Sequence, residues 1–171
     1  MEAVDAATLR ASFVNCSRSV AATLPLPELA DQPWADLDFL GWRDARAPLR
    51  AYLVAPRPAG LDAPRANVGL VLRVAQPPPG RRGGRLCALC HAAHAADGVR
   101  LVTGVRPSRP GGGHSSAGTY LCADLACSLY ARGLRLPPGP QPEPAATPGR
   151  LAELVARRDA FVTWLAGSAS R

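Results

Sequence analysis

Four of the five cysteines in the sequence fall into two close pairs whose spacing could hold a metal ion. Cys87 and Cys90 lie in the segment CALC, and Cys122 and Cys127 lie in CADLAC. A regular helix turns by about 100° per residue, so Cys122 and Cys127 would point about 140° apart if one helix carried both. They can meet if Cys122 ends the incoming segment, Asp124 caps a helix, and Cys127 lies in its first turn, where backbone N–H groups favour a thiolate.

Two cysteine pairs of this kind predict one structural zinc ion with four thiolate ligands. A Cys-x2-Cys turn wraps one side of a tetrahedral ion, and a strand-loop-strand between the pairs would bring the helix N-terminus round to the other side. This order of knuckle, hairpin and ligand-bearing helix is that of a treble-clef zinc finger. Because four thiolates leave no position for a water molecule, a catalytic zinc is disfavoured. Disulfides would need an oxidising compartment, which nothing in the sequence indicates.

The histidines and the fifth cysteine leave alternatives open. His91 adjoins Cys90 and could replace it as a ligand; otherwise His91 and His94 lie beside the site or face the solvent. We expect His114, in a glycine-rich loop, to be exposed. Cys16 has no partner in the sequence and is interpreted as a small, half-buried core residue, or as a nucleophile if a histidine reaches it in the fold.

The sequence does not favour an enzyme. The loop RPGGGHSSAG lacks the Gly-Lys-Ser/Thr ending of a phosphate-binding loop, so flexibility is the better interpretation. Paired carboxylates, a metalloprotease helix and a serine elbow are also absent from the sequence. We therefore expect a binding protein without catalytic activity.

Hydrophobic periodicity predicts the elements that must position the cysteines. We expect a helix over 5–16, a hairpin of two strands, LRAYLVA and VGLVLRVA, a third strand GVRLVTGVR, and a short helix after Cys122. The stretch WADLDFLGW before the hairpin is interpreted as irregular. An apolar stripe beginning at Leu151 predicts a C-terminal helix that ends at Gly167.

These elements predict an α+β fold: a small antiparallel sheet with a treble-clef zinc finger, an N-terminal helix and a C-terminal helix. The expected organisation is a helical or irregular segment over 1–40 packing on the core, the zinc-finger domain over 41–136, a Pro-rich linker over 137–148, and an amphipathic helix over 149–166.

The net charge and the hydropathy of the sequence limit the kinds of partner that the protein can have. The formal charge is +7, and all 20 basic residues are arginine in a chain rich in Ala, Gly and Pro, so coding bias weakens the inference to nucleic acid. A zinc ion with four thiolates would lower the charge to about +5, which suits an acidic protein or an RNA surface. Because the sequence lacks an apolar run of about 18 residues and a signal-peptide pattern, we expect a cytoplasmic monomer with no membrane contact.

Several phrases together resemble a known family: SFVNCS, WADLDFLGWRDARAPLRAYLV, VGLVLR, CALC and GTYLCADLACSLYARG. They are similar to the elongation factor G-binding proteins whose C-terminal part is a treble-clef zinc finger, a group that includes the FusB-type fusidic-acid resistance proteins. The likeness runs from about residue 10 to about residue 135, and the short actinobacterial members are especially similar. Carried over by position, the zinc ligands would be Cys87, Cys90, Cys122 and Cys127.

The resemblance implies a cytoplasmic protein that binds elongation factor G through its zinc finger and, in resistance members, helps to release the factor from stalled ribosomes. The residues that we expect to contact the factor are Arg106, Arg109, His114, Tyr130 and Arg132. The alternative is an RNA- or ribosome-binding zinc finger that uses the arginine-rich segments. Because the few aromatic residues are not interleaved with those segments as stacking platforms, the sequence disfavours this alternative.

Overall fold

The computed structural model describes residues 1–63, 65–76, 85–95, 97–107, 115–138 and 148–167. The helices are α1 (Ala6–Ala11), α2 (Arg18–Ala22), α3 (Cys127–Ala131) and α4 (Pro148–Ala166), and a short 3-10 helix, η1, covers Trp34–Asp36. The strands are β1 (Leu40–Arg43), β2 (Arg50–Pro56), β3 (Asn67–Val74), β4 (Arg85–Leu86), β5 (Ala93–His94), β6 (Val99–Val105) and β7 (Ser116–Cys122). The expected α+β class is confirmed.

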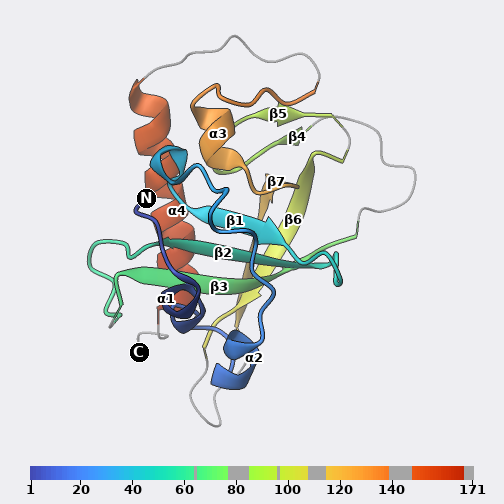
Figure 1. The fold of residues 1–171 in the computed structure, drawn as a ribbon. Coiled ribbons are helices and arrows are strands. Elements are labelled where there is room, and N and C mark those ends of the chain that lie inside the picture. The colour runs from blue at the N-terminus through green and yellow to red at the C-terminus, as the bar shows by residue number, and fades with distance from the viewer. Residues whose placement is uncertain (64, 77–84, 96, 108–114, 139–147, 168–171) are drawn as a thin grey trace.

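The main sheet is antiparallel and has the strand order β1-β2-β3-β6-β7 (Figure 1). The predicted hairpin is confirmed as β2 and β3, and the predicted third strand is β6. The interpretation of the stretch before the hairpin as irregular is wrong at its end, because β1 forms there. Leu40 and Trp42 in β1 are buried while their neighbours are partly exposed, so this short strand alternates as a half-buried edge strand does.

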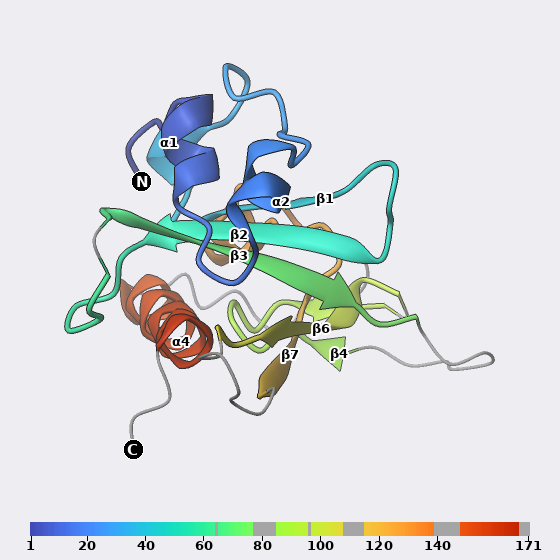
Figure 2. The same cartoon turned by 90° about the horizontal axis from the view of Figure 1, so that it is seen from below.

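Helices cover both faces of the sheet. Figure 2 shows α1 and α2 on one face of β2 and β3, and α4 on the opposite face. The strand β2 alternates accordingly: Tyr52 and Val54 belong to the cluster beneath the N-terminal helices, whereas Leu53 belongs to the cluster that α4 covers. The side chains of β2 from Ala51 to Ala55 are fully buried on both faces of the sheet. The sheet is therefore the central layer, with helices on either side.

The C-terminal helix packs into the larger cluster. Leu154, Val162 and Leu165 of α4 are completely buried there, and Gly104 of β6 lets the helix approach because an added Cβ would lie 2.8 Å from Leu165. The predicted apolar stripe therefore contacts the sheet. The linker expected before this helix falls mainly on 139–147, which lie outside the described residues.

The N-terminal helix is shorter than predicted. It ends at Ala11, and the next residues run alongside β3, where Phe13 and Gly69 form a parallel bridge. A side chain at position 69 could not fit, because its Cβ would lie 2.7 Å from the Ser12 Oγ atom. The apolar spacing of Leu9 and Phe13 predicts a helix that continues beyond Ala11. Instead, the backbone after Ala11 pairs with β3, so its hydrogen bonds go to that strand and not to a further helical turn.

Asn15 fills the opening between β3 and β6, which pair only near one end. Its side-chain amide accepts a hydrogen bond from the Val71 backbone N–H at 2.8 Å and donates to the Val71 carbonyl at 2.9 Å. It also donates to the Val105 carbonyl at 3.1 Å. One side chain therefore satisfies backbone groups on two diverging strands.

We predict that Asn15→Ala lowers the free energy of unfolding by about 2 kcal/mol, because it leaves backbone groups of both strands without partners. Urea denaturation followed by circular dichroism measures this change. The control is Gln32→Ala, which removes one exposed side-chain bond to the Glu28 carbonyl and should cost less than about 0.5 kcal/mol. Equal losses in the two variants would contradict the assigned role of Asn15.

Candidate metal centre

Four cysteine side chains meet in one buried cluster. The Sγ atoms of Cys87, Cys90, Cys122 and Cys127 all lie within 4.8 Å of one another. The Cys87 and Cys127 sulfurs are 3.6 Å apart, and those of Cys90 and Cys122 are 3.4 Å apart. The two sequence pairs therefore contribute jointly to a single site, as the spacing predicted.

These distances fit a tetrathiolate zinc site. Sulfurs bound at about 2.3 Å to one tetrahedral ion would lie about 3.8 Å from each other, close to the observed separations. A disulfide would bring two sulfurs to about 2.05 Å, and all four thiols are free. The cysteines are thus positioned to bind one zinc ion, which would hold together the segments that carry them.

Electrostatics explain why the cluster needs a cation. Hydrogen bonds from Cys122, Cys127 and Cys90 lower the pKa of Cys87. Hydrogen bonds with Cys122 and Cys87 raise the pKa of Cys127 well above its ordinary value. Without a metal, four negative charges cannot coexist in this buried volume. A divalent cation supplies the charge that keeps all four thiolates deprotonated.

The first pair lies on a tight knuckle between β4 and β5. The Cys87 N–H donates to the Ala92 carbonyl at 3.0 Å, and the His91 N–H donates to the Cys87 carbonyl at 2.9 Å. His91 adopts a left-handed φ of 56°, which turns the chain directly after Cys90. Its side chain is exposed and is not part of the cluster, so Cys90 holds the position for which His91 was the alternative.

The second pair joins the end of a strand to the start of a helix. Cys122 is the last residue of β7, and Cys127 is the first residue of α3. The prediction that Asp124 caps this helix needs correction, because the N-cap residue is Ala126. Asp124 instead accepts from the Ala126 N–H at 3.1 Å and from the Tyr130 hydroxyl at 2.8 Å, so its carboxylate fixes the turn before the helix.

His94 lies directly beside the cluster. Its ring is buried, its Nε2 atom is 3.2 Å from the Cys122 Sγ atom, and the ring packs edge-on against Tyr130. Burial lowers the pKa of His94, which favours the neutral imidazole. A neutral imidazole with a proton on Nε2 can donate to the thiolate of Cys122 and reduce its charge without being a ligand.

Residues 8–165 match the family described as the FBP C-terminal treble-clef zinc-finger. The chain belongs to this family. The match includes all four cysteines and most of the described chain, and it confirms the resemblance that the sequence phrases indicated. A comparison with curated proteins found no match to the chain. In the part of the chain that the structure describes, no helix is long and apolar enough to cross a membrane.

In this zinc-finger protein, Asp38 connects the metal-binding helix to the rest of the fold. Its carboxylate accepts two hydrogen bonds from Arg132, and its backbone N–H donates to the Ser128 Oγ atom at 2.9 Å. The Asp38 carbonyl accepts from the buried Arg158 of α4 at 2.6 Å. The hydrogen bonds with Asp38 raise the pKa of Arg132. One residue therefore ties α3 to α4, and sequence patterns gave no signal for it.

The helix α4 also holds the zinc knuckle directly. Arg157 donates to the Leu89 carbonyl at 3.1 Å, and Arg150 reaches the Cys90 carbonyl at 3.5 Å. Both carbonyls belong to the turn that carries the first cysteine pair. The position of α4 therefore restrains the metal ligands, although no α4 residue belongs to the cluster.

Of the five residues expected to contact a partner, the structure describes three: Tyr130 and Arg132 at the end of α3, and Arg106 after β6. Tyr130 is buried beside the zinc cluster, and Arg132 is engaged by Asp38. Arg106 follows the far end of β6, where its guanidinium stacks on Trp164 and donates to the Gly167 carbonyl. The remaining two, Arg109 and His114, lie outside the described residues.

Cys16 remains separate from the metal centre. It is half-buried near α2, and burial raises the pKa of its thiol. A raised pKa keeps the thiol protonated, which disfavours a nucleophilic role.

We predict that Cys127→Ala lowers the zinc content well below one ion per chain and lowers the melting temperature by about 10 °C or more, because a structural zinc contributes directly to folding. Elemental analysis and calorimetry measure both effects. Cys16→Ala is the matched control and should keep its zinc. A Cys127→Ala variant with full zinc content would show that this thiol is not a ligand.

We also predict that Arg157→Met speeds zinc transfer to a chelator several-fold, because the knuckle loses a charge-assisted bond to the Leu89 carbonyl. The control is Glu153→Ala, which removes the exposed ion pair with Arg157 but keeps the bond to the knuckle. It should change the transfer rate less than about twofold. Equal rates for all three proteins would show that α4 does not restrain the site.

Proposed function

We propose that the protein is a zinc-stabilised, non-enzymatic binding protein for translation elongation factor G, acting in the cytoplasm and promoting release of the factor from stalled ribosomes as fusidic-acid resistance proteins do. Membership of the zinc-finger family carries this proposal. The chemistry of the site supports it, because four thiolates fill a tetrahedral zinc ion and leave no place for a substrate or water. The zinc would therefore act through the shape that it maintains.

The surface that best fits this role follows α3, the helix that carries Cys127. Residues 133–136, which we name the α3 exit segment, expose Leu134 by 60% and Leu136 by 74%. These are the two most exposed large apolar side chains in the described part of the chain. Aliphatic side chains at this exposure are unfavourable in water and gain free energy when a partner covers them. This segment is the part of the proposed contact surface that sequence analysis missed.

The α3 exit segment is held in place. Gly133, with a left-handed φ of 69°, ends the helix, and the backbone N–H groups of Leu134 and Arg135 both donate to the Leu129 carbonyl. The Arg135 side chain forms an ion pair with Asp124 at 3.0 Å. The two leucines are therefore presented from a fixed turn that begins six residues after Cys127, and little ordering entropy would be lost on binding.

We predict that the double variant Leu134→Ser, Leu136→Ser weakens binding of elongation factor G by about tenfold or more, because two buried apolar contacts are lost. Isothermal calorimetry with the purified factor measures the affinity. The control is Leu49→Ser, which removes another exposed leucine, from the turn between β1 and β2. This variant should bind the factor with unchanged affinity. A double variant that binds as tightly as the unmodified protein would exclude this surface.

Clean folding and full zinc content with no detectable binding of elongation factor G would exclude the proposed function itself. The RNA-binding alternative is tested in the same series with ribosomal RNA over a range of salt concentrations. RNA binding would weaken steeply with salt because phosphate contacts release counterions, whereas contacts through exposed leucines would not. A salt-sensitive affinity for RNA, without affinity for the factor, would replace the proposal.

A further inference from the structure

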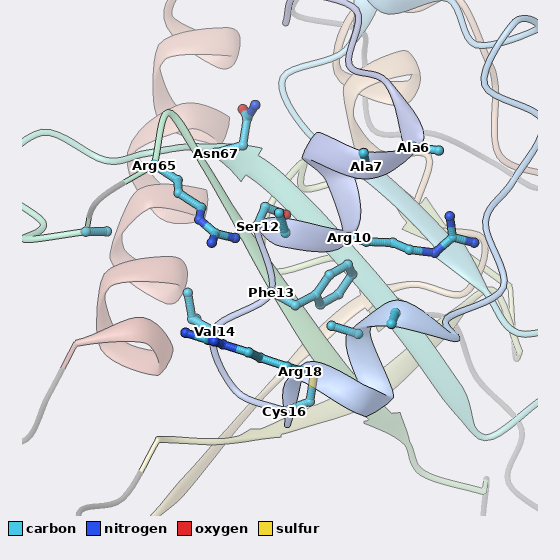
Figure 3. Close-up of a pocket in the computed structure, with 14 residues that line it drawn as sticks. Ala6, Ala7, Arg10, Ser12, Phe13, Val14, Cys16, Arg18, Arg65 and Asn67 are labelled. Atoms are coloured by element: carbon cyan, nitrogen blue, oxygen red, sulfur yellow. The ribbon is translucent and has the colours of Figure 1, made fainter.

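A cavity of about 920 Å³ opens between the two N-terminal helices and the loop that precedes β3 (Figure 3). It lies apart from the metal centre, because none of the four cysteines lines it. Its volume is within the range of pockets that bind small organic molecules, about 300–1,000 Å³. Neither the zinc site nor the proposed contact surface uses this cavity.

Small side chains create the space. Alanines line it from α1, from α2 and from the loop before β3, at Ala6, Ala7, Ala11, Ala21, Ala22 and Ala63. Phe13 and Val14, on the extended segment after α1, add larger apolar surface between the helices. Most of the lining is therefore apolar, which suits the body of an organic ligand better than a hydrated ion.

The charged residues that line the cavity are all arginines. Arg10, Arg18 and Arg65 contribute to the lining, and none of the described lining residues is acidic. Figure 3 shows Arg18 reaching from α2 and Arg65 from the loop toward the side of the cavity where Val14 lies. Three guanidinium groups near an apolar surface create a positive potential that attracts anions.

Within the described residues, the side chains of Arg18 and Arg65 are without partners, as are those of Arg46 and Arg73, but of these four only Arg18 and Arg65 line the cavity. By contrast, Arg132, Arg135 and Arg158 each pair with an aspartate. Arg10 donates to the Leu24 carbonyl at 3.2 Å, but its Nε atom is buried without a hydrogen-bond partner. Figure 3 shows the Arg10 side chain directed away from Arg18 and Arg65, so Arg10 adds positive charge at the cavity but does not contact the same anion.

We propose that this cavity is a binding site for a small amphipathic anion, such as a medium-chain carboxylate. The carboxylate would be held by Arg18 and Arg65, since a planar guanidinium can donate two parallel hydrogen bonds to it. The hydrocarbon chain would lie against Phe13, Val14 and the alanines of α1 and α2. This inference does not depend on binding of elongation factor G.

The experiment uses 8-anilinonaphthalene-1-sulfonate, an apolar anion whose fluorescence rises on leaving water, with the zinc-loaded protein. We expect the dye to bind saturably and to be displaced by decanoate. The neutral decanol should displace the dye at least about tenfold less effectively than decanoate does. The double variant Arg18→Gln, Arg65→Gln should lose about tenfold in affinity for the dye and for decanoate. The control Arg46→Gln, Arg73→Gln changes the net charge equally at exposed positions outside the cavity and should bind normally.

A second variant tests the cavity rather than the charge. Ala11 is exposed on α1, so Ala11→Phe can fill the space without disturbing the core, and it should abolish binding of the dye. Zinc content and near-ultraviolet circular dichroism verify that each variant is folded. Three results would overturn the inference: equal displacement by decanoate and decanol, equal affinities of the two double variants, or undiminished binding by folded Ala11→Phe.

Discussion

The structure depends on bringing four thiol groups together in a volume too small and too dry to hold their charges. Hydrogen bonds among the thiols lower the pKa of Cys87 and raise that of Cys127, and burial disfavours further negative charge. A divalent cation changes this balance, and it fixes four points that belong to a knuckle, a strand end and a helix start. Metal binding and folding of this half of the molecule are therefore one process.

The constraint extends beyond the ligands through a few polar contacts. Asp38 joins α3 to α4 by accepting from Arg132 and Arg158, while Arg157 of α4 holds the knuckle at the Leu89 carbonyl. The α3 exit segment follows the same helix, so its exposed leucines are positioned by the zinc centre. A structural metal would in this way set the shape of the proposed contact surface.

The sequence was most informative where one local pattern decides the structure. Cysteine spacing predicted the zinc centre, and alternating or helical periodicity predicted β2, β3, β6 and α4. The helix predicted over 5–16 is too long, because the chain after Ala11 leaves the helix and pairs with β3 at Gly69. The contacts of Asn15 and Asp38 join residues more than 50 positions apart, and no local pattern reports on such pairs.

In the proposed metal centre all four thiols of the cluster, and no histidine, hold one zinc ion. X-ray absorption at the zinc edge measures this most directly, since it reports the number and type of the atoms bound to the metal. We predict four sulfur atoms at about 2.3 Å and no nitrogen or oxygen neighbour. Three sulfurs with a nitrogen at about 2.0 Å would contradict this prediction and would make His91 or His94 a ligand in place of a cysteine.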